Sequence, residues 1–331
     1  MELEKRIFAA STGDFNNLAI ELFQFQYQEN PIYRQYCDSL KVDAHTVDSF
    51  EKIPYLPISF FKTHTVKTTE FEAETVFESS GTTGSINSKH FVKDLTLYKE
   101  SFNTCFEKFY GLPKYKCILG LLPSYLERKS SSLVFMTEEL IRESGNSLSG
   151  FYLTDHEKLH RTLMHNELLK SSTLLIGVTY ALLDFAEKFP MQLRHTIVME
   201  TGGMKGRRAE MTRKQVHEQL QAQLGIDLVH SEYGMTEMLS QAYSKGDGIF
   251  HCPGWMKVLL RDEDDPFHVM GAVKADSRSL TGVINIIDLA NIYSCSFIAT
   301  DDIGRLHANE SFEVMGRMDN SDIRGCSLLT I

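Results

Sequence analysis

Short apolar runs alternate with amphipathic stretches through the middle of the chain. Strand-like runs occur at residues 117–122, 174–178, 196–199 and 226–229, and helical stretches include residues 131–142 and 208–224. This alternation favours a largely parallel sheet with helices on its faces. From Trp255 onwards, the short runs MKVLL, VINIID and SFIAT predict a more β-rich lobe. The sequence therefore predicts an α/β fold.

Helices are also predicted before and after a proline-containing connector. The stretch up to about residue 42 has helical periodicity, and prolines at positions 54 and 57 then open an extended segment. Asp94 and Gly111 are suited to begin and end a further helix. The apolar residues of that helix are spaced three and four apart and are Leu95, Tyr98, Phe102, Phe106 and Phe109.

The composition allows one large domain. At 331 residues with 42% hydrophobic content, the chain can bury a sizeable core. A net charge of −10 argues against a nucleic-acid binder, because affinity for a phosphate backbone comes from clustered Lys and Arg. The first residues lack signal-peptide order and no apolar run is long enough to cross a bilayer, so we expect a cytoplasmic protein. The six cysteines contain no CxxC pair, as expected for reduced thiols.

The run at residues 77–90, FESSGTTGSINSKH, concentrates hydroxyls and glycines. Glycine reaches backbone conformations closed to other residues, so successive N–H groups can converge on an anion, and hydroxyls add donors. The residues with these properties are Ser79, Ser80, Gly81, Thr82, Thr83 and Gly84. The run is not a Walker loop, because Ser85 follows Gly84 where that loop needs lysine. Its residue types suit a phosphate-binding loop, which we call the phosphate cradle, and the alternative is a polar surface loop.

Three further segments follow in order, namely EYGMTE at residues 232–237, ATDDIGR at 299–305 and GRMDNSDIRGCS at 316–327. Together with SSGTTG, they resemble the signatures SGTTG, YGxTE, TGD and GRxD followed by RG of the adenylate-forming superfamily. That superfamily includes acyl-CoA synthetases, luciferases and nonribosomal adenylation domains. The chain is most similar to the acyl-protein synthetase of the bacterial bioluminescence fatty-acid reductase, with phenylacetate–CoA ligases next. This likeness rests on PYLPISFFKTHTVKT, LLPSYLERKSSSLVFM, ETGGMKGRR and RGCSLL.

The resemblance implies a large N-terminal adenylate-forming domain with mixed, largely parallel sheets flanked by helices and a smaller β-rich lobe. We expect residues 1–70 to form a helical region packed on the core, residues 71–315 the AMP-binding core and residues 316–331 a hinge-like tail. Full-length members continue past the hinge into a mobile C-terminal domain, whose lysine assists adenylation. Because this chain stops at Ile331, we expect that domain to be absent and a partner or an internal acceptor to substitute.

The resemblance also implies a nucleotide site. The implied contacts are the β- and γ-phosphates of ATP for Ser79 to Gly84, the purine for Gly202 and Gly203, adenine stacking for Tyr233, the α-phosphate for Thr236, Mg²⁺ for Glu237, the ribose for Asp302, and the ribose and hinge for Arg317. Asp301 stands where the family has glycine, so the choice between the two acids is open. The alternatives are a core aromatic for Tyr233, an ordinary turn for Gly202 and Gly203, a helix N-terminus for Thr236 and Glu237, and a surface arginine for Arg317.

The implied chemistry is activation of a carboxylic acid. A free carboxylate has a poor leaving group, so attack on the α-phosphate of ATP gives an acyl-adenylate with a good one. The resemblance implies this reaction for a fatty or aryl acid, with release of pyrophosphate and acyl transfer to a protein thiol. Cys326, in RGCS, is the implied acceptor, and a small buried thiol is the alternative.

Two other function classes stay open. One is a ligase that transfers the acyl group to CoA or a carrier protein and needs a partner. The other is a catalytically reduced nucleotide-binding module of an acyl-transfer complex. In each case we expect ATP/AMP and Mg²⁺ as ligands, a small-molecule carboxylic acid as substrate, and an acyl-accepting or reductase protein as partner.

Residues 156–160 read HEKLH, which formally matches the HExxH zinc-peptidase pattern. Asp155 stands where a helix N-cap belongs, so the motif would occupy an exposed first turn. Lys158 places a cation within it, and no third ligand is evident. We therefore expect the match to be a coincidence.

Overall fold

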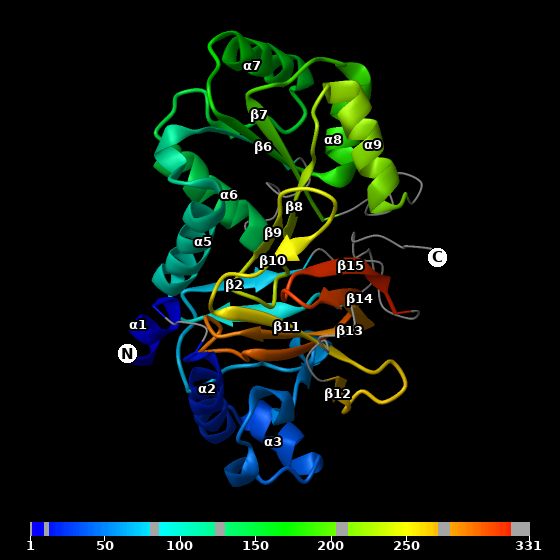
Figure 1. The fold of residues 1–331 in the computed structure, drawn as a ribbon. Coiled ribbons are helices and arrows are strands. Elements are labelled where there is room, and N and C mark those ends of the chain that lie inside the picture. Colours follow the sequence, from blue (N-terminus) through cyan, green and yellow to red (C-terminus); the bar gives the residue numbers. More distant parts are fainter. Residues whose placement is uncertain are drawn as a thin grey trace.

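The computed structural model describes residues 2–9, 13–79, 86–122, 130–202, 211–270 and 279–318. Within these ranges, thirteen strands form one mixed sheet and two more form a separate hairpin. Figure 1 shows the helix-flanked parallel half of the large sheet at the top and the antiparallel half below it. The α/β class predicted from the sequence is confirmed.

One half of the large sheet is parallel. In spatial order its strands are β5 (Gly150–Phe151), β4 (Cys117–Leu121), β6 (Thr173–Val178), β7 (Thr196–Thr201) and β8 (His230–Tyr233). The crossovers between them contain α6 (Ser132–Ser144), α7 (His156–Leu168), α8 (Thr179–Lys188) and α9 (Arg213–Leu224). Strands β4 and β6 are buried at every residue, as expected for parallel strands covered on both faces.

The strand predicted at residues 226–229 is wrong, because the structure places β8 four residues later. Helix α9 ends at Gly225, whose φ of 60° is a left-handed conformation that suits glycine. The next residues return the chain to the sheet, and Leu228 is 47% exposed. The apolar run is therefore the connection from α9 to the sheet. The more polar segment HSEY forms strand β8, which pairs in parallel with β7.

The sheet continues from β8 with antiparallel strands. In spatial order they are β9 (Ala242–Ser244), β10 (Phe250–His251), β15 (Phe312–Arg317), β14 (Phe297–His307), β13 (Ser279–Asp288), β11 (Met256–Arg261) and β12 (Val269–Met270). A short strand, β1 (Leu56–Pro57), pairs in parallel with β14. The β-rich region predicted after Trp255 is confirmed, and among the described strands parallel pairing is confined to the other half and to β1.

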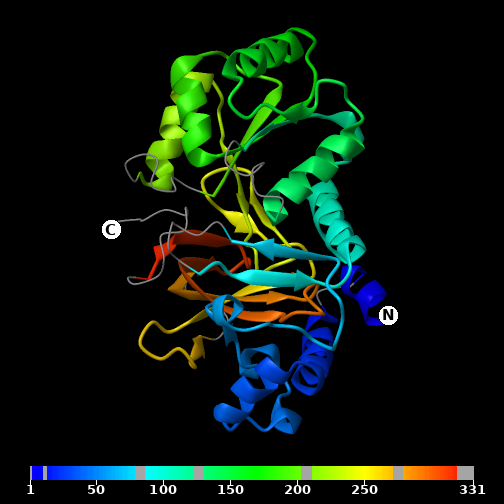
Figure 2. The same cartoon turned by 180° about the vertical axis from the view of Figure 1, so that it is seen from behind.

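Helices from the N-terminal part of the chain lie against the antiparallel half (Figures 1 and 2). They are α1 (Glu2–Phe8), α2 (Phe15–Glu29), α3 (Pro31–Ser39) and α4 (Phe60–Thr63), with the 3-10 turns η1 (Ala44–Thr46) and η2 (Phe50–Lys52). Gln26 of α2 is fully buried and donates through Nε2 to the carbonyl of Asn291 at 3.0 Å. Its Oε1 accepts from the backbone N–H of Ser296 at 2.9 Å. The predicted helices are therefore present, whereas the division at residues 70 and 315 stays a prediction.

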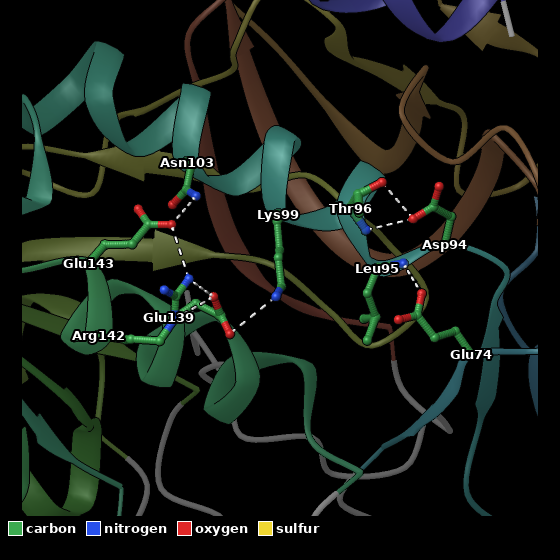
Figure 3. Close-up of polar contacts among 9 residues, drawn as sticks. All are labelled: Glu74, Asp94, Leu95, Thr96, Lys99, Asn103, Glu139, Arg142 and Glu143. Carbon is green, nitrogen blue, oxygen red and sulfur yellow. Dashed lines mark hydrogen bonds and ion pairs between the residues drawn. The ribbon is translucent and has the colours of Figure 1, made fainter.

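The separate hairpin leads into the longest helix that the structure describes. Strands β2 (Thr75–Glu78) and β3 (Lys89–Val92) lie in front of the antiparallel strands in Figure 2, and α5 (Leu95–Tyr110) follows. Asp94 caps α5 by accepting from the backbone N–H of Thr96 at 2.7 Å. Glu74 accepts from the backbone N–H of Leu95 at 2.7 Å, which fixes the start of the helix beside β2 (Figure 3). Gly111 ends it with a φ of 77°, as predicted.

Two polar contacts hold α5 against α6, as Figure 3 shows. Lys99 Nζ lies 3.3 Å from Glu139 Oε1, and Asn103 Nδ2 donates to Glu143 Oε1 at 2.8 Å. The helix after the hairpin is thereby tied to the crossover that follows β4. Within the described ranges, none of the helices combines the length and apolar character that a bilayer crossing requires.

The HEKLH motif lies in the first turns of α7. His156 packs edge-on against Phe185, and His160 stacks on Phe189 with ring centroids 5.0 Å apart. Asp155 caps the helix through the backbone N–H of Lys158, at 3.0 Å. The two imidazoles are held by separate aromatic rings, which agrees with a coincidental match.

A substitution at Gly282 in β13 tests how closely β13 packs against β11 and β12. A Cβ there would lie 2.6 Å from the backbone oxygen of Arg261 and closer still to Met270. Gly282→Ala therefore requires a backbone shift, and we expect the free energy of unfolding in urea to fall by about 2 kcal/mol. Gly150→Ala in β5 is the matched control, because no atom lies within 4 Å of the added Cβ. Equal destabilisation by both substitutions would contradict the close approach.

Candidate active site

Strands β2 and β3 bracket the SSGTTG run. Ser79 follows β2, and its backbone N–H donates to the carbonyl of Ser88 at 3.1 Å. Its Oγ accepts from the backbone N–H of Ser88 at 2.9 Å. These two bonds close the base of the hairpin connection. The other predicted cradle residues, Ser80, Gly81, Thr82, Thr83 and Gly84, lie outside the described residues.

His90 of β3 connects this hairpin to the EYGMTE segment. Its ring is buried, and Nδ1 lies 2.8 Å from the carbonyl oxygen of Thr236. Because a carbonyl only accepts hydrogen bonds, Nδ1 carries the proton. Burial lowers the pKa of His90, so the ring is neutral at pH 7. The strand that follows the predicted phosphate cradle therefore contacts the residue predicted to bind the α-phosphate.

Buried side chains from the antiparallel half fix the turn that contains Thr236 and Glu237. Asp288, at the end of β13, accepts from the backbone N–H groups of Leu239 at 2.8 Å and Ser240 at 3.0 Å. Asn291 donates through Nδ2 to the carbonyl of Glu237 at 2.8 Å. The side chain of Glu237 is itself fully buried. The position of the predicted Thr-Glu pair is thus set by β13 and the segment after it.

Asp302 of β14 joins the remaining predicted segments. Its Oδ2 accepts from the hydroxyl of Tyr233 at 2.8 Å, and its Oδ1 accepts from Nε of Arg317 at 3.0 Å. Asp301 lies 3.7 Å from Nη2 of Arg317, and its side chain is 40% exposed against 7% for Asp302. Asp302 is therefore the acid at the centre of this cluster, and Asp301 lies at its rim.

The ring of Tyr233 is part of an aromatic group. It packs edge-on against Phe250 and Phe312, with ring centroids 5.9 Å and 5.5 Å away. The residue is buried, so the core-aromatic alternative describes much of its environment. Stacking of adenine on this ring stays a prediction.

The ETGG and EYGMTE segments meet where β7 and β8 end. Thr201 donates through Oγ1 to Oε2 of Glu232 at 2.5 Å. Gly202 follows with a φ of 80°, a left-handed conformation that favours glycine. Burial raises the pKa of Glu232 to about 7. Gly203, the second predicted purine contact, lies outside the described residues.

Glu200, one residue before Thr201, is a second buried carboxylate. It accepts from the hydroxyl of Thr179 at 3.0 Å, and Arg213 Nε and His217 Nε2 lie 3.6 Å and 3.7 Å away. Burial opposes its charge, but His217 and Arg213 outweigh burial and lower the pKa of Glu200 to about 2. Arg213 also donates to the carbonyl of Val314 in β15 at 2.8 Å. Helix α9 therefore connects the end of β7 to the strand that carries Arg317.

Three contacts thus connect the four sequence segments. They are His90 with Thr236, Tyr233 with Asp302, and Arg317 with Asp302. Gly202 and Tyr233 lie at the carboxyl ends of parallel strands, which is where open α/β sheets bind ligands. Cys326, the predicted acyl acceptor, lies outside the described residues.

Comparisons with known proteins bear on this arrangement. Residues 10–103 match the family model described as acyl-protein synthetase, LuxE. The chain resembles the LuxE acyl-protein synthetases. The long-chain-fatty-acid–luciferin-component ligase of Aliivibrio fischeri is 22% identical, over 95% of this chain and 86% of that protein. The ligase of the same name from Vibrio harveyi is 41% identical over 63 residues, which cover 19% of this chain and 16% of that protein. The relationship predicted from the sequence is confirmed.

Solved structures share the fold. A 2-hydroxyisobutyryl-CoA ligase in complex with R3-HIB-AMP superimposes with a TM-score of 0.62 at 10% identity, over 96% of this chain and 70% of that one. ATP-bound MatB from Rhodopseudomonas palustris gives a TM-score of 0.51 at 14% identity, over 73% of this chain and 47% of that one. The chain thus spans about half the length of MatB. The adenylate-forming fold implied by the four segments is therefore present.

Sequence reasoning missed the residues that hold the predicted ones in place. Asp288 and Asn291 had a visible signal, because Asp288 ends the strand-like run VINIID and Asn291 follows three residues later. His90 lay within the quoted run, but its partner Thr236 is 146 positions away. Glu200 and Glu232 stand at the ends of strands, where burial could not be read without the neighbouring helices.

Glu232 predicts a pH dependence of stability. Its pKa of about 7 exceeds the ordinary 4.5, so between these values the folded state holds the extra proton. Stability should therefore fall as the pH rises through this window, by about 3 kcal/mol in total. Glu232→Gln cannot lose that proton, so its free energy of unfolding in urea should lack this decline. Glu157→Gln, on an exposed turn of α7, should keep the wild-type profile. Parallel profiles for wild type and Glu232→Gln would assign the decline to another group.

Proposed function

We propose that this chain is an ATP-dependent ligase that converts a carboxylic acid to an acyl-adenylate and passes the acyl group to a protein thiol. The observation that carries the proposal is the set of contacts from His90 to Thr236 and from Asp302 to Tyr233 and Arg317. These contacts gather segments that resemble the adenylate-forming signatures. The likeness to LuxE acyl-protein synthetases supports the same function.

In the first step, a carboxylate oxygen of the substrate attacks the α-phosphorus of ATP. The bond from that phosphorus to the oxygen bridging to the β-phosphate breaks, and pyrophosphate leaves. Such a reaction depends mainly on positioning and on electrostatic stabilisation of the phosphates. The hydroxyl of Thr236 would donate to the α-phosphate, and the bond from His90 to its carbonyl restricts where that hydroxyl can lie.

Asp302 has the capacity for a ribose contact. An ionised carboxylate offers about four acceptor positions. Tyr233 and Arg317 each occupy one of them, on different oxygens. The remaining lone pairs can accept from ribose hydroxyls, while the charge of Arg317 offsets the cost of burying the carboxylate.

The donor set also fits a magnesium ion that arrives with the nucleotide. Mg²⁺ is commonly held by one or two carboxylates together with substrate phosphates. The described residues contain no group of three His, Cys, Asp or Glu that could hold a metal alone, and Glu237 is the buried acid beside Thr236. Glu237 would help to hold the ion, which would neutralise charge on the phosphates.

In the second step, a thiolate attacks the acyl carbon, forms a thioester and releases AMP. The described cysteines are poor candidates, because burial raises the pKa of Cys37 and of Cys252 to about 12 and also raises those of Cys105, Cys117 and Cys295. A thiol with a pKa this high is protonated at neutral pH and is a weak nucleophile. From the resemblance of the RGCS segment to acyl-protein synthetases, we propose Cys326 as the acceptor, with a reductase or other acyl-accepting protein as the next partner.

The names of the relatives favour a fatty acid over an aryl acid, because both ligases are named for long-chain fatty acids. CoA is the second candidate acceptor, since the similar 2-hydroxyisobutyryl enzyme is a CoA ligase. Acid-dependent exchange of labelled pyrophosphate into ATP separates these enzymes from an inactive module. Exchange with no acid of a fatty and aryl panel, despite ATP binding, would favour the module.

Asp302 should matter more than Asp301 for nucleotide binding. In the exchange assay, Asp302→Asn should raise the KM for ATP about tenfold, the size expected for one charge-assisted hydrogen bond, with less change in kcat. Asp301→Asn is the matched control on the neighbouring residue and should change the KM less than about threefold. The opposite order would assign the ribose to Asp301.

Cys326 should carry the acyl group. Labelled fatty acid and ATP should leave a label on the protein that neutral hydroxylamine removes, as a thioester requires. Cys326→Ser should abolish that label while pyrophosphate exchange survives, because adenylation precedes transfer. Cys252→Ser, a matched change at a half-buried cysteine, should retain the label. A hydroxylamine-sensitive label on Cys326→Ser would refute the assignment.

A further inference from the structure

We propose that one face of the protein binds an anionic membrane surface. The face is formed by the 3-10 turn η3 (Pro113–Tyr115), the residue after it and the C-terminal end of α7. We call it the basic-apolar surface, and its residues are Lys114, Tyr115, Lys116, Leu168, Leu169 and Lys170. The proposal does not depend on the proposed catalytic function.

The two segments of this surface are neighbours at one edge of the sheet. Lys116 donates through Nζ to Oγ of Ser172 at 3.4 Å, and the backbone N–H of Cys117 donates to the carbonyl of Ser172 at 2.9 Å. These residues stand where β4 and β6 begin. Leu168 and Leu169 come shortly before Ser172, at the end of α7, so both segments share this edge.

The apolar side chains of the surface are open to solvent. Leu168 is 80% exposed, Tyr115 is 69% exposed and Leu169 is 63% exposed. Large apolar side chains exposed together mark an interaction site more often than an ordinary surface. Two exposed leucines at the end of a helix, and an exposed tyrosine on the neighbouring segment, suit the shallow interface of a bilayer, where tyrosine is enriched.

The charges of the surface indicate the chemistry of its partner. Within the described part of the chain, Lys114, Lys116 and Lys170 take part in no ion pair. The Nζ of Lys114 lies 5.1 Å from the ring centroid of Tyr115. The carboxylate of Glu167, the acid in the last turn of α7, accepts hydrogen bonds from the backbone N–H groups of Arg194 and His195, just before β7. Three cations without ionic partners therefore adjoin the exposed apolar residues, in a chain of net charge −10. Anionic lipid complements both features.

The basic-apolar surface lies away from the candidate active site. It adjoins the beginnings of β4 and β6, whereas Gly202 and Tyr233 lie at the ends of β7 and β8. Because these strands are parallel, the two locations are on opposite edges of the sheet, with α7 at the top of Figure 1. Attachment through this surface leaves the nucleotide side open to solvent.

Sedimentation with lipid vesicles tests the proposal. The full chain should bind vesicles that contain phosphatidylglycerol at about 0.1 M salt, and much less at about 1 M salt, where charges are screened within roughly 3 Å. It should bind pure phosphatidylcholine vesicles weakly. Lys114→Glu with Lys170→Glu should weaken binding to the anionic vesicles at least about twentyfold, since each lysine near such a surface contributes about fivefold. Leu168→Ser with Leu169→Ser should weaken it at both salt concentrations.

Matched variants outside the basic-apolar surface control for the change of charge and the loss of an apolar side chain. Lys5→Glu with Lys41→Glu makes the same change of charge near α1 and α3, and Phe267→Ser removes another exposed apolar side chain. Both should bind anionic vesicles within about twofold of wild type. Absence of binding to anionic vesicles, or binding that the surface variants retain, overturns the proposal. Self-association that Leu168→Ser with Leu169→Ser abolishes, without vesicle binding, would instead assign the surface to a protein contact.

Discussion

The position of β8 in the sheet is the constraint on which the candidate site depends. This strand pairs in parallel with β7 on one side and antiparallel with β9 on the other. Parallel neighbours require helical crossovers and antiparallel neighbours allow short connections, so two kinds of chain path meet at this strand. Tyr233, the last residue of β8, can therefore contact β14, and Thr236, shortly after the strand, can contact β3. A site built from distant segments follows from that one junction.

Buried polar groups then fix the junction. Asp288, Glu200 and Asp302 are carboxylates held by backbone N–H groups, by cations or by hydroxyls from other elements. Burial would be costly for each acid alone, and each partner that offsets this cost also fixes a distance between two elements. Burial outweighs the partners at Asp288, whose pKa is raised, and at Glu232, whose pKa is raised to about 7 despite the hydrogen bond from Thr201. The site therefore combines two carboxylates paired with arginines, Glu200 and Asp302, with a buried acid in β8 whose pKa is raised to about 7.

Local signals in the sequence predicted the elements well where the local chain decides the structure. Asp94 begins α5 and Gly111 ends it, because an N-cap and a left-handed glycine determine helix ends through contacts within a few residues. The strand predicted at residues 226–229 was misplaced for a non-local reason. An apolar run can be a connection packed beside a sheet or a strand within it, and distant residues decide between the two. The candidate site shows the same division. Tyr233 and the pair Asp301 and Asp302 stood out through their motifs, whereas the role of His90 became visible only from its contact with the carbonyl of Thr236.

By itself, the sequence determined the α/β class, the capped helices and the order of four segments that resemble adenylate-forming signatures. Each of these depends on spacing or on residue type within a short stretch, which the linear chain records directly. Only the tertiary structure decided that Asp302 is the buried partner of Tyr233 and Arg317, that Asp301 lies at the rim, and that Glu232 is buried beside Thr201. Burial and hydrogen bonding depend on which distant strands become neighbours, and the pairing of β8 sets that arrangement.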